Sequence, residues 1–297
     1  MKRHPFFITL CLLLALLTGC GRQQTPAQIA ATTLPVYEFT SRLCQNTPLT
    51  VTRLVTEEVS CLHDYSLNVR QVKAAEAAEV IVVSGAGLEE FMEDILLDAP
   101  TIDASGHIKL ITPEKHSHDH EHEENRHEGH HHEQDPHIWL SPANAMVMAE
   151  NICRGLTEQY PNYENTFSAN LTLLLNELTV LKDYGTASLS HLSCREIITF
   201  HDGFAYLADS YDLTILDAIE EESGSEASAR ELIHMIGEVE HHSLPAIFTE
   251  KSGSASAAGI ISRETSVKTF ALDMAMAGDS YFDAMYHNID TLKEALQ

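Results

Sequence analysis

The chain has few basic residues. Lysine and arginine number 18 among 297 residues, against 44 aspartates and glutamates, so the formal net charge is −26 at pH 7. A chain this acidic does not hold nucleic acid or an anionic surface by bulk electrostatic attraction. Negative charge suits a bound cation, but it also serves solubility. The charge therefore argues against nucleic acid as a partner and leaves the identity of any ligand open.

Cysteine is also scarce, and its spacing argues against a thiolate zinc site. No CxxC pair follows Cys20, and such pairs are typical of zinc sites built from cysteine. The later cysteines are Cys44, Cys61, Cys153 and Cys194. In an exported chain they permit two disulfides with three possible pairings. A Cys44–Cys61 bridge is disfavoured, because a helix over 35–45 would carry Cys44 about 13 Å along its axis, whereas bridged Cα atoms lie within about 7 Å.

Long hydrophobic runs are lacking after the first twenty residues, so no later segment is expected to span a membrane. The opening MKRHPFFITLCLLLALLTGC has basic residues at Lys2 and Arg3 and an apolar run over 5–17. This pattern is typical of a secretory signal peptide, here residues 1–19. LTGC resembles the bacterial lipobox, which implies a lipid on Cys20; an ordinary cleaved signal is the alternative. The mature chain is expected outside the cytoplasm, anchored to the bacterial membrane by that lipid.

Strand-like and helix-like patterns alternate in both halves of the chain. In the first half we expect strands at 29–34, 49–55 and 80–84, and helices at 35–45, 66–78 and 88–97. In the second half we expect strands at 195–200, 213–216, 246–249 and 267–272, and helices at 203–211, 227–241, 253–263 and 280–296. This alternation predicts an α/β fold with a mainly parallel sheet flanked by helices in each half.

A long helix is expected between the halves, over 162–184. Its apolar residues recur every three or four positions, at Phe167, Leu171, Leu174, Leu175, Leu178 and Leu181. At about 1.5 Å per residue this helix would span about 35 Å, the length of a small domain. Because the same pattern occurs on both sides, we interpret it as a backbone helix that joins two lobes. The predicted organisation is a signal peptide (1–19), an N-terminal lobe (20–161), the connecting helix (162–184) and a C-terminal lobe (185–297).

A histidine-rich insert over 115–134 interrupts the N-terminal lobe. Its eight histidines are His116, His118, His120, His122, His127, His130, His131 and His132. Its composition cannot bury a core, so we expect a surface loop. Fixing one binding geometry there would cost ordering entropy. The insert is therefore expected to bind zinc weakly and in several ways, and a role in solubility alone is the alternative.

Four residues outside the insert are candidates for a tight metal site. His63 follows the strand expected at 49–55, His201 follows the one at 195–200, and Asp273 follows the one at 267–272. In open α/β sheets, ligands bind at these carboxyl ends of strands. The fourth candidate is His137, in DPHIWLSP.

Three imidazoles and a carboxylate suit tetrahedral Zn²⁺, and neutral imidazole favours zinc over manganese. Each candidate histidine has an aspartate close in sequence, namely Asp64, Asp135 and Asp202. Such a carboxylate can fix the tautomer of an imidazole ligand. Adjacency in sequence does not establish that contact.

Nearly the whole mature chain resembles the metal-binding lipoproteins of bacterial ABC importers, cluster A-I, and most closely their ZnuA-like zinc branch. The resemblance is carried by LTGC, HDYSLNVRQV, the histidine-rich loop, DPHIWLSP, TFHDGFAYLA and LDMAMAGDSYFDAMYHNIDTL. It implies two α/β lobes joined by one long backbone helix, with the metal between the lobes. The ligands it implies are His63, His137, His201 and Asp273. The manganese branch has a glutamate where this chain has His201.

Two segments depart from the family pattern. LHDYSL stands where the family usually reads PHDYEP, which brings Cys61 close to a ligand in sequence. LDMAMAG replaces the commoner LDPLG, so Asp273 is the least secure ligand. Asp279 is the alternative, and Asp273 is preferred because it follows directly on a strand.

The resemblance implies a non-enzymatic protein that captures Zn²⁺ and delivers it to an ABC permease and its ATPase. The sequence leaves the oligomeric state open, although a monomer suffices for delivery. A manganese-binding homologue is the first alternative. A zinc hydrolase needs an open coordination position, which Asp273 would fill, and the chain has no HExxH or GxSxG motif. An adhesin role is a third possibility, for which the chain shows no dedicated module.

Overall fold

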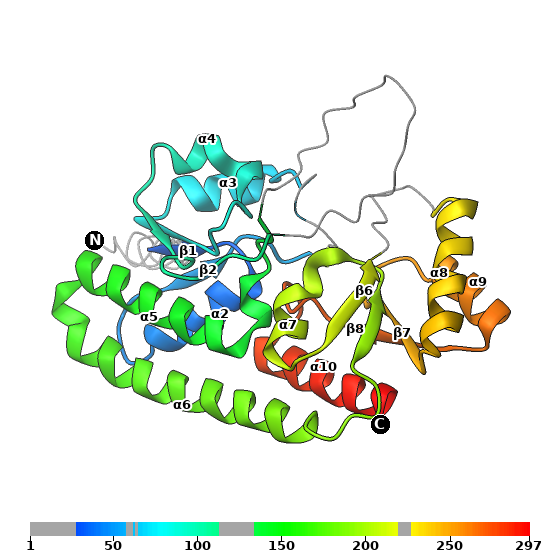
Figure 1. The fold of residues 1–297 in the computed structure, drawn as a ribbon. Helices are drawn as coiled ribbons and strands as arrows, with labels where there is room; N and C mark the ends of the chain where they lie inside the picture. The colour runs from blue at the N-terminus through cyan, green and yellow to red at the C-terminus, as the bar shows by residue number, and fades with distance from the viewer. Residues whose placement is uncertain (1–27, 58–61, 63–64, 113–133, 219–226) are drawn as a thin grey trace, which may run out of the picture.

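Two four-stranded parallel sheets form the framework (Figure 1). The computed structural model describes residues 28–57, 62, 65–112, 134–218 and 227–297. The first sheet contains β1 (Ile29–Ala31), β2 (Val51–Arg53), β3 (Val80–Val83) and β4 (Thr101–Asp103) in the order β2-β1-β3-β4. The second contains β5 (Glu196–Thr199), β6 (Thr214–Ala218), β7 (Ala246–Glu250) and β8 (Lys268–Leu272) in the order β6-β5-β7-β8. The two sheets therefore share one topology.

Helices cover both sheets and link them. Those of the first half are α2 (Leu34–Leu43), α3 (Val69–Glu76), α4 (Glu93–Leu96) and α5 (Pro142–Gln159). Those of the second half are α7 (Ala205–Ser210), α8 (Ala229–His242), α9 (Ser256–Thr265) and α10 (Tyr281–Leu296). Between them, α6 (Glu164–Ser188) contacts α2, α5 and α10 and runs past both sheets (Figure 1). Short 3₁₀ turns are η1 (Glu90–Met92), η2 (Ile138–Leu140), η3 (Pro161–Tyr163) and η4 (Asp202–Phe204).

The predicted two-sheet α/β architecture is confirmed, with three local differences. The helix expected at 88–97 is the 3₁₀ turn η1 followed by the single turn α4. β4 was not predicted; it is three residues long and has only its central residue buried. α5 was not predicted either, although Ser141 caps its first turn and Pro142 begins it, a pattern typical of a helix start.

The inner faces of the two sheets share one core. Ile29 and Val82 of the first sheet belong to the same buried cluster as Ile197 and Phe248 of the second. The outer faces have separate clusters: Ala30 and its neighbours pack under α3 and α4, and Ile247 and its neighbours pack under α8 and α9. This alternation follows from the period of two along a strand. The continuous core holds the lobes together as one body.

The structure also bears on the cysteines and on membrane spans. Cys44, Cys153 and Cys194 are free thiols, and Cys61 lies outside the described residues. The two disulfides that the sequence permits are thus not formed among these three. Within the described ranges, no helix has the length and apolar character needed to cross a bilayer.

Candidate metal centre

Two of the candidate histidines meet where the two lobes join. The ring centroids of His137 and His201 are 5.2 Å apart, with the rings nearly perpendicular at 82°. His137 directly precedes η2, while His201 directly precedes η4, just beyond β5. Sequence positions 64 residues apart, one on each side of α6, therefore contribute to one place. His63 and the eight histidines of the insert lie outside the described residues.

A buried carboxylate fixes the orientation of His137. Asp135 Oδ1 lies 2.8 Å from His137 Nδ1 and also accepts a hydrogen bond from the His137 backbone N–H at 2.8 Å. Both residues are only 4% exposed. A proton on Nδ1 shared with Asp135 leaves the lone pair of Nε2 for a metal ion. The sequence analysis named Asp135 as a neighbour, and the structure establishes the contact.

Gly203 allows the two imidazoles to approach each other. A Cβ atom at this position would lie 2.7 Å from His201 Cδ2 and 2.8 Å from His137 Cε1. It would also lie 2.7 Å from the terminal methyl of Met274. Contacts this short do not occur between real atoms, so a larger residue would displace the rings. Gly203 was not among the predicted site residues, and its position two residues after His201 was the available signal.

Hydrogen bonds fasten the loop after β8 to the first lobe. Trp139 Nε1 donates to the Met274 carbonyl at 2.7 Å, and the Tyr281 hydroxyl donates to the Trp139 carbonyl at 2.8 Å. The Leu34 N–H donates to the Met276 carbonyl at 3.1 Å. Trp139 and Tyr281 are fully buried, and buried groups of this kind depend on being paired. The loop that carries Asp273 is thus fixed from both lobes.

Asp273 is held at the end of β8 with both carboxylate oxygens in use. Its Oδ1 accepts a hydrogen bond from the Ala275 N–H at 2.8 Å, and its Oδ2 lies 3.1 Å from Lys251 Nζ. Its backbone exchanges two hydrogen bonds of 2.7 Å with the side chain of Asn288. Asp279, the alternative ligand, is exposed. Within the described residues no three His, Cys, Asp or Glu side chains form a group that could hold a metal. Of the candidate ligands, His137 and His201 are in contact.

A buried glutamate that the sequence analysis missed lies beside Asp273. Glu250 is the last residue of β7 and is 6% exposed. Burial, followed by the negative charge of Asp273, raises the pKa of Glu250 to about 8. The available signal was an acidic residue at the end of the apolar run AIFTE, because strand ends on this edge carry the candidate ligands.

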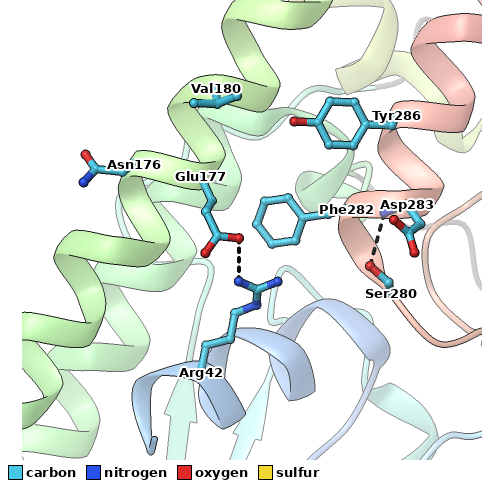
Figure 2. A pocket seen from close by; sticks show the side chains of 8 residues that line it. All are labelled: Arg42, Asn176, Glu177, Val180, Ser280, Phe282, Asp283 and Tyr286. Carbon is cyan, nitrogen blue, oxygen red and sulfur yellow. Dashed lines mark hydrogen bonds and ion pairs between the residues drawn. The ribbon is translucent and has the colours of Figure 1, made fainter.

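A cavity of about 350 Å³ lies elsewhere, between α2, α6 and α10 (Figure 2). Its lining contains no histidine. Arg42 in this cavity bonds to Glu177 at 2.6 Å and to Glu38 at 2.9 Å, and it stacks over the Phe282 ring at 4.6 Å. The guanidinium is already neutralised, so the cavity presents no free charge for an anionic ligand. It is distinct from the place where the two histidines meet.

Comparisons with known proteins identify the family. Residues 29–295 match the family described as zinc-uptake complex component A, periplasmic (ZnuA). A match over this much of the chain, together with the two-lobed fold, means that the chain belongs to the ZnuA family.

Individual relatives agree with this assignment. The chain is 30% identical over 314 aligned positions to the zinc-binding lipoprotein AdcA of Streptococcus pneumoniae, covering 99% of this chain but 61% of AdcA. It is 26% identical to the high-affinity zinc uptake system protein ZnuA of Bacillus subtilis, covering 98% of this chain and 96% of that protein. The solved structure of Zn(II)-bound AdcA from Streptococcus pneumoniae superposes with a TM-score of 0.74 at 28% identity, over 90% of this chain and 57% of that one. The chain thus spans about three fifths of the AdcA relatives it matches.

Proposed function

We propose that this protein binds Zn²⁺ between its two lobes and delivers it to an ABC permease. The observation that carries the proposal is the meeting of His137 and His201, from opposite sides of α6, at 5.2 Å between ring centroids. When His137 Nδ1 donates its hydrogen bond to Asp135 Oδ1, Nε2 is left as the ligating atom. Two neutral imidazoles at one place favour zinc over the oxygen-preferring manganese.

The proposed ligand set is His63, His137, His201 and Asp273. Three imidazoles and a carboxylate complete a tetrahedral shell and leave no position for an activated water. Asp273 is preferred over Asp279, because Asp273 lies at the strand end with its backbone fixed by Asn288. A closed shell fits a protein that carries its metal and does no chemistry on a substrate. Manganese is the weaker alternative cargo.

The proposed location is outside the cytoplasm, with the mature chain anchored through a lipid on Cys20. The permease and its ATPase are the proposed partners, and a monomer suffices for delivery. Relatives described as a zinc-binding lipoprotein and as a component of a zinc uptake system support this placement. The proposed division of the chain keeps 1–19 as the signal, 20–161 and 185–297 as the lobes and 162–184 as the link.

The histidine-rich insert is proposed as an accessory that binds zinc more weakly than the site between the lobes. The described residues that flank the insert, Ile111 and Asp135, are fixed to each other close to His137 in the sequence. The Asp135 N–H donates to the Ile111 carbonyl at 2.8 Å, and the Tyr206 hydroxyl bridges the two, accepting from the Ile111 N–H and donating to the Asp135 carbonyl. Zinc collected by the insert would therefore enter close to the ligand that Asp135 orients.

A zinc titration against a competing chelator tests the proposal. The sample is the mature protein lacking residues 116–132, and His201→Ala in the same background is its control. We expect one tight equivalent in the deletion variant and none after His201→Ala. Loss of all tight binding on deletion would place the site in the insert and would refute the proposed ligands. A parallel titration with Mn²⁺ decides between the two metals.

A further inference from the structure

The carboxylate of Asp273 already has a cationic partner within the protein. Lys251 is the residue that directly follows β7, and its Nζ lies 3.1 Å from Asp273 Oδ2. The Lys251 N–H also donates to the Leu272 carbonyl at 2.8 Å, so the backbone of Lys251 is fixed against the residue that precedes Asp273. This ion pair belongs to the carboxyl edge of the second sheet.

Within the described residues, the two oxygens of Asp273 have different partners, and Oδ2 is the one that faces a cation. The Ala275 N–H occupies Oδ1 at 2.8 Å. Asn288, which is fully buried, fixes the Asp273 backbone through two hydrogen bonds, and the bond from the Ala275 N–H holds the carboxylate in its orientation. A metal ligated by Asp273 would therefore bind Oδ2, the atom that the ammonium group now contacts.

A metal ion and the ammonium group exclude each other at that oxygen. Zn²⁺ binds carboxylate oxygens at about 2.0–2.2 Å, and a monovalent cation on the same oxygen would be close enough to repel it strongly. The Lys251 side chain is 59% exposed, whereas that of Asp273 is 17% exposed. The lysine can therefore withdraw into solvent when a metal arrives and return when the metal leaves.

We propose that Lys251 is a built-in competitor for the metal at Asp273, which lowers zinc affinity and favours release. This inference rests on the proposed function, specifically on Asp273 as a ligand. A delivery protein must release its cargo, and a tethered cation stabilises the metal-free carboxylate without closing the site to solvent. Removing the charge of Lys251 should thus tighten zinc binding, a gain that misfolding cannot produce.

Zinc competition titrations on the full mature chain test the inference. Lys251→Met keeps most of the side-chain stem and removes the charge, and Lys251→Gln is a second neutral variant. Because exposed ion pairs are worth about 0.2–1 kcal/mol, we expect zinc affinity to rise by about 1.4- to 5-fold. Lys251→Arg retains the charge and should bind as the parent does. Lys268→Met, at the other end of β8, is the matched control and should change nothing.

The variant Asp273→Asn tests whether Asp273 is a zinc ligand, independently of whether Lys251 competes with the metal. If Asp273 is a ligand, this variant binds zinc more weakly, and adding Lys251→Met to it gives no further gain. If Asp273→Asn binds zinc weakly but Lys251→Met and Lys251→Gln bind it no more tightly than the parent, the competitor role of Lys251 is wrong. The assignment of Asp273 as a ligand would then remain. If Asp273→Asn binds zinc as tightly as the parent, Asp273 is not a ligand and the inference is refuted with it.

Discussion

The two lobes have the same strand order but present their proposed ligands differently. In the second lobe, His201 and Asp273 lie just beyond the ends of β5 and β8, where a parallel sheet usually places ligands. In the first lobe, His137 comes from a turn outside the sheet and depends on Asp135 for its orientation. A shared topology thus fixes which edge of a sheet faces the site. It does not fix which segment supplies the ligand.

The third strand of each sheet leads to a buried glutamate. In the first lobe, burial raises the pKa of Glu89 to about 7 against the opposing effect of hydrogen bonds from Thr32 Oγ1, Ser84 N–H and Gly85 N–H. In the second lobe, Glu250 reaches a pKa of about 8 through burial and the charge of Asp273. The first acid stabilises a turn of its own lobe, whereas the second is coupled to a proposed ligand.

The largest expected effect tests whether both lobes hold the metal. His137→Ala and His201→Ala should each weaken zinc binding by about 1,000-fold, or about 4 kcal/mol, because each removes one ligand of the proposed four-coordinate shell. Chelator competition measures both. His242→Ala is the control, since His242 pairs with Glu196 at the start of β5, away from the ligand edge. If only one of the two ligand variants lost affinity, a site shared between the lobes would be excluded.

The second largest expected effect is the pH dependence of the stability of the metal-free protein, which depends on Glu89 in the first lobe. A folded-state pKa of about 7, raised from 4.5, means that the folded protein keeps the Glu89 proton longer than the unfolded chain does. The resulting stability is complete below about pH 4.5 and is lost as pH rises through 7, by up to about 3 kcal/mol. Glu89→Gln cannot ionise and should not show this loss.

Urea unfolding in the presence of a chelator, from pH 4.5 to 8.5, measures this prediction. The relevant quantity is the change with pH of the stability difference between variant and parent, because losing a backbone hydrogen bond at Gly85 adds a constant cost. A difference that does not vary with pH would show that Glu89 ionises at its ordinary pKa. Glu93→Gln, an acid at the exposed start of α4, is the control.

The sequence predicted the fold well because its strands are buried and its helices are periodic. β3 and β7 are buried at every position, so their apolar runs are continuous. β4 was missed because three residues with one buried side chain give no periodic signal. α5 was missed although Ala145, Met148, Ala149 and Ile152 are buried at helical spacing. Local patterns specify elements that bury a face, and they fail where an element is too short to have one.

The site was only partly predictable for a different reason. His137 and His201 were both expected, and the structure brings them together. Gly203 and Glu250 were not expected, since their importance comes from what packs against them in space. The pairing of Asp273 with Lys251 likewise joins the ends of two strands that are neighbours only in the sheet. These residues matter because of contacts between segments that are distant in the sequence, and local sequence patterns do not reveal such contacts.

A smaller effect tests the orientation of the ligand of the first lobe. Asp135→Asn keeps an acceptor for His137 Nδ1 but removes the charge, so zinc affinity should fall by about 10- to 100-fold. Asp183→Asn, an exposed position on α6, is the control. Unchanged affinity in Asp135→Asn would mean that the hydrogen bond alone orients the ring. The charge of Asp135 would then play no part in how the first lobe presents His137.

The smallest effect tests how the lobes are joined, with two buried tyrosines as a matched pair. The Tyr281 hydroxyl donates to the Trp139 carbonyl across the junction at 2.8 Å. The Tyr211 hydroxyl, which is also buried, has no hydrogen-bond partner among the described residues. Tyr281→Phe should cost about 1 kcal/mol of unfolding free energy, because it also leaves a buried carbonyl unpaired. Tyr211→Phe should be neutral or slightly stabilising, since no bond is lost.

Both variants should unfold in one cooperative transition in urea, because a single core runs through both lobes. A second transition in Tyr281→Phe would mean that the lobes are separate units joined mainly by this hydrogen bond. Equal losses in the two variants would show that the tyrosines contribute by packing alone. A larger loss of stability in Tyr281→Phe than in Tyr211→Phe would mean that hydrogen bonds stabilise the junction between the lobes in addition to buried apolar surface. That pairing, through Trp139 and Met274, also holds the segment that follows Asp273.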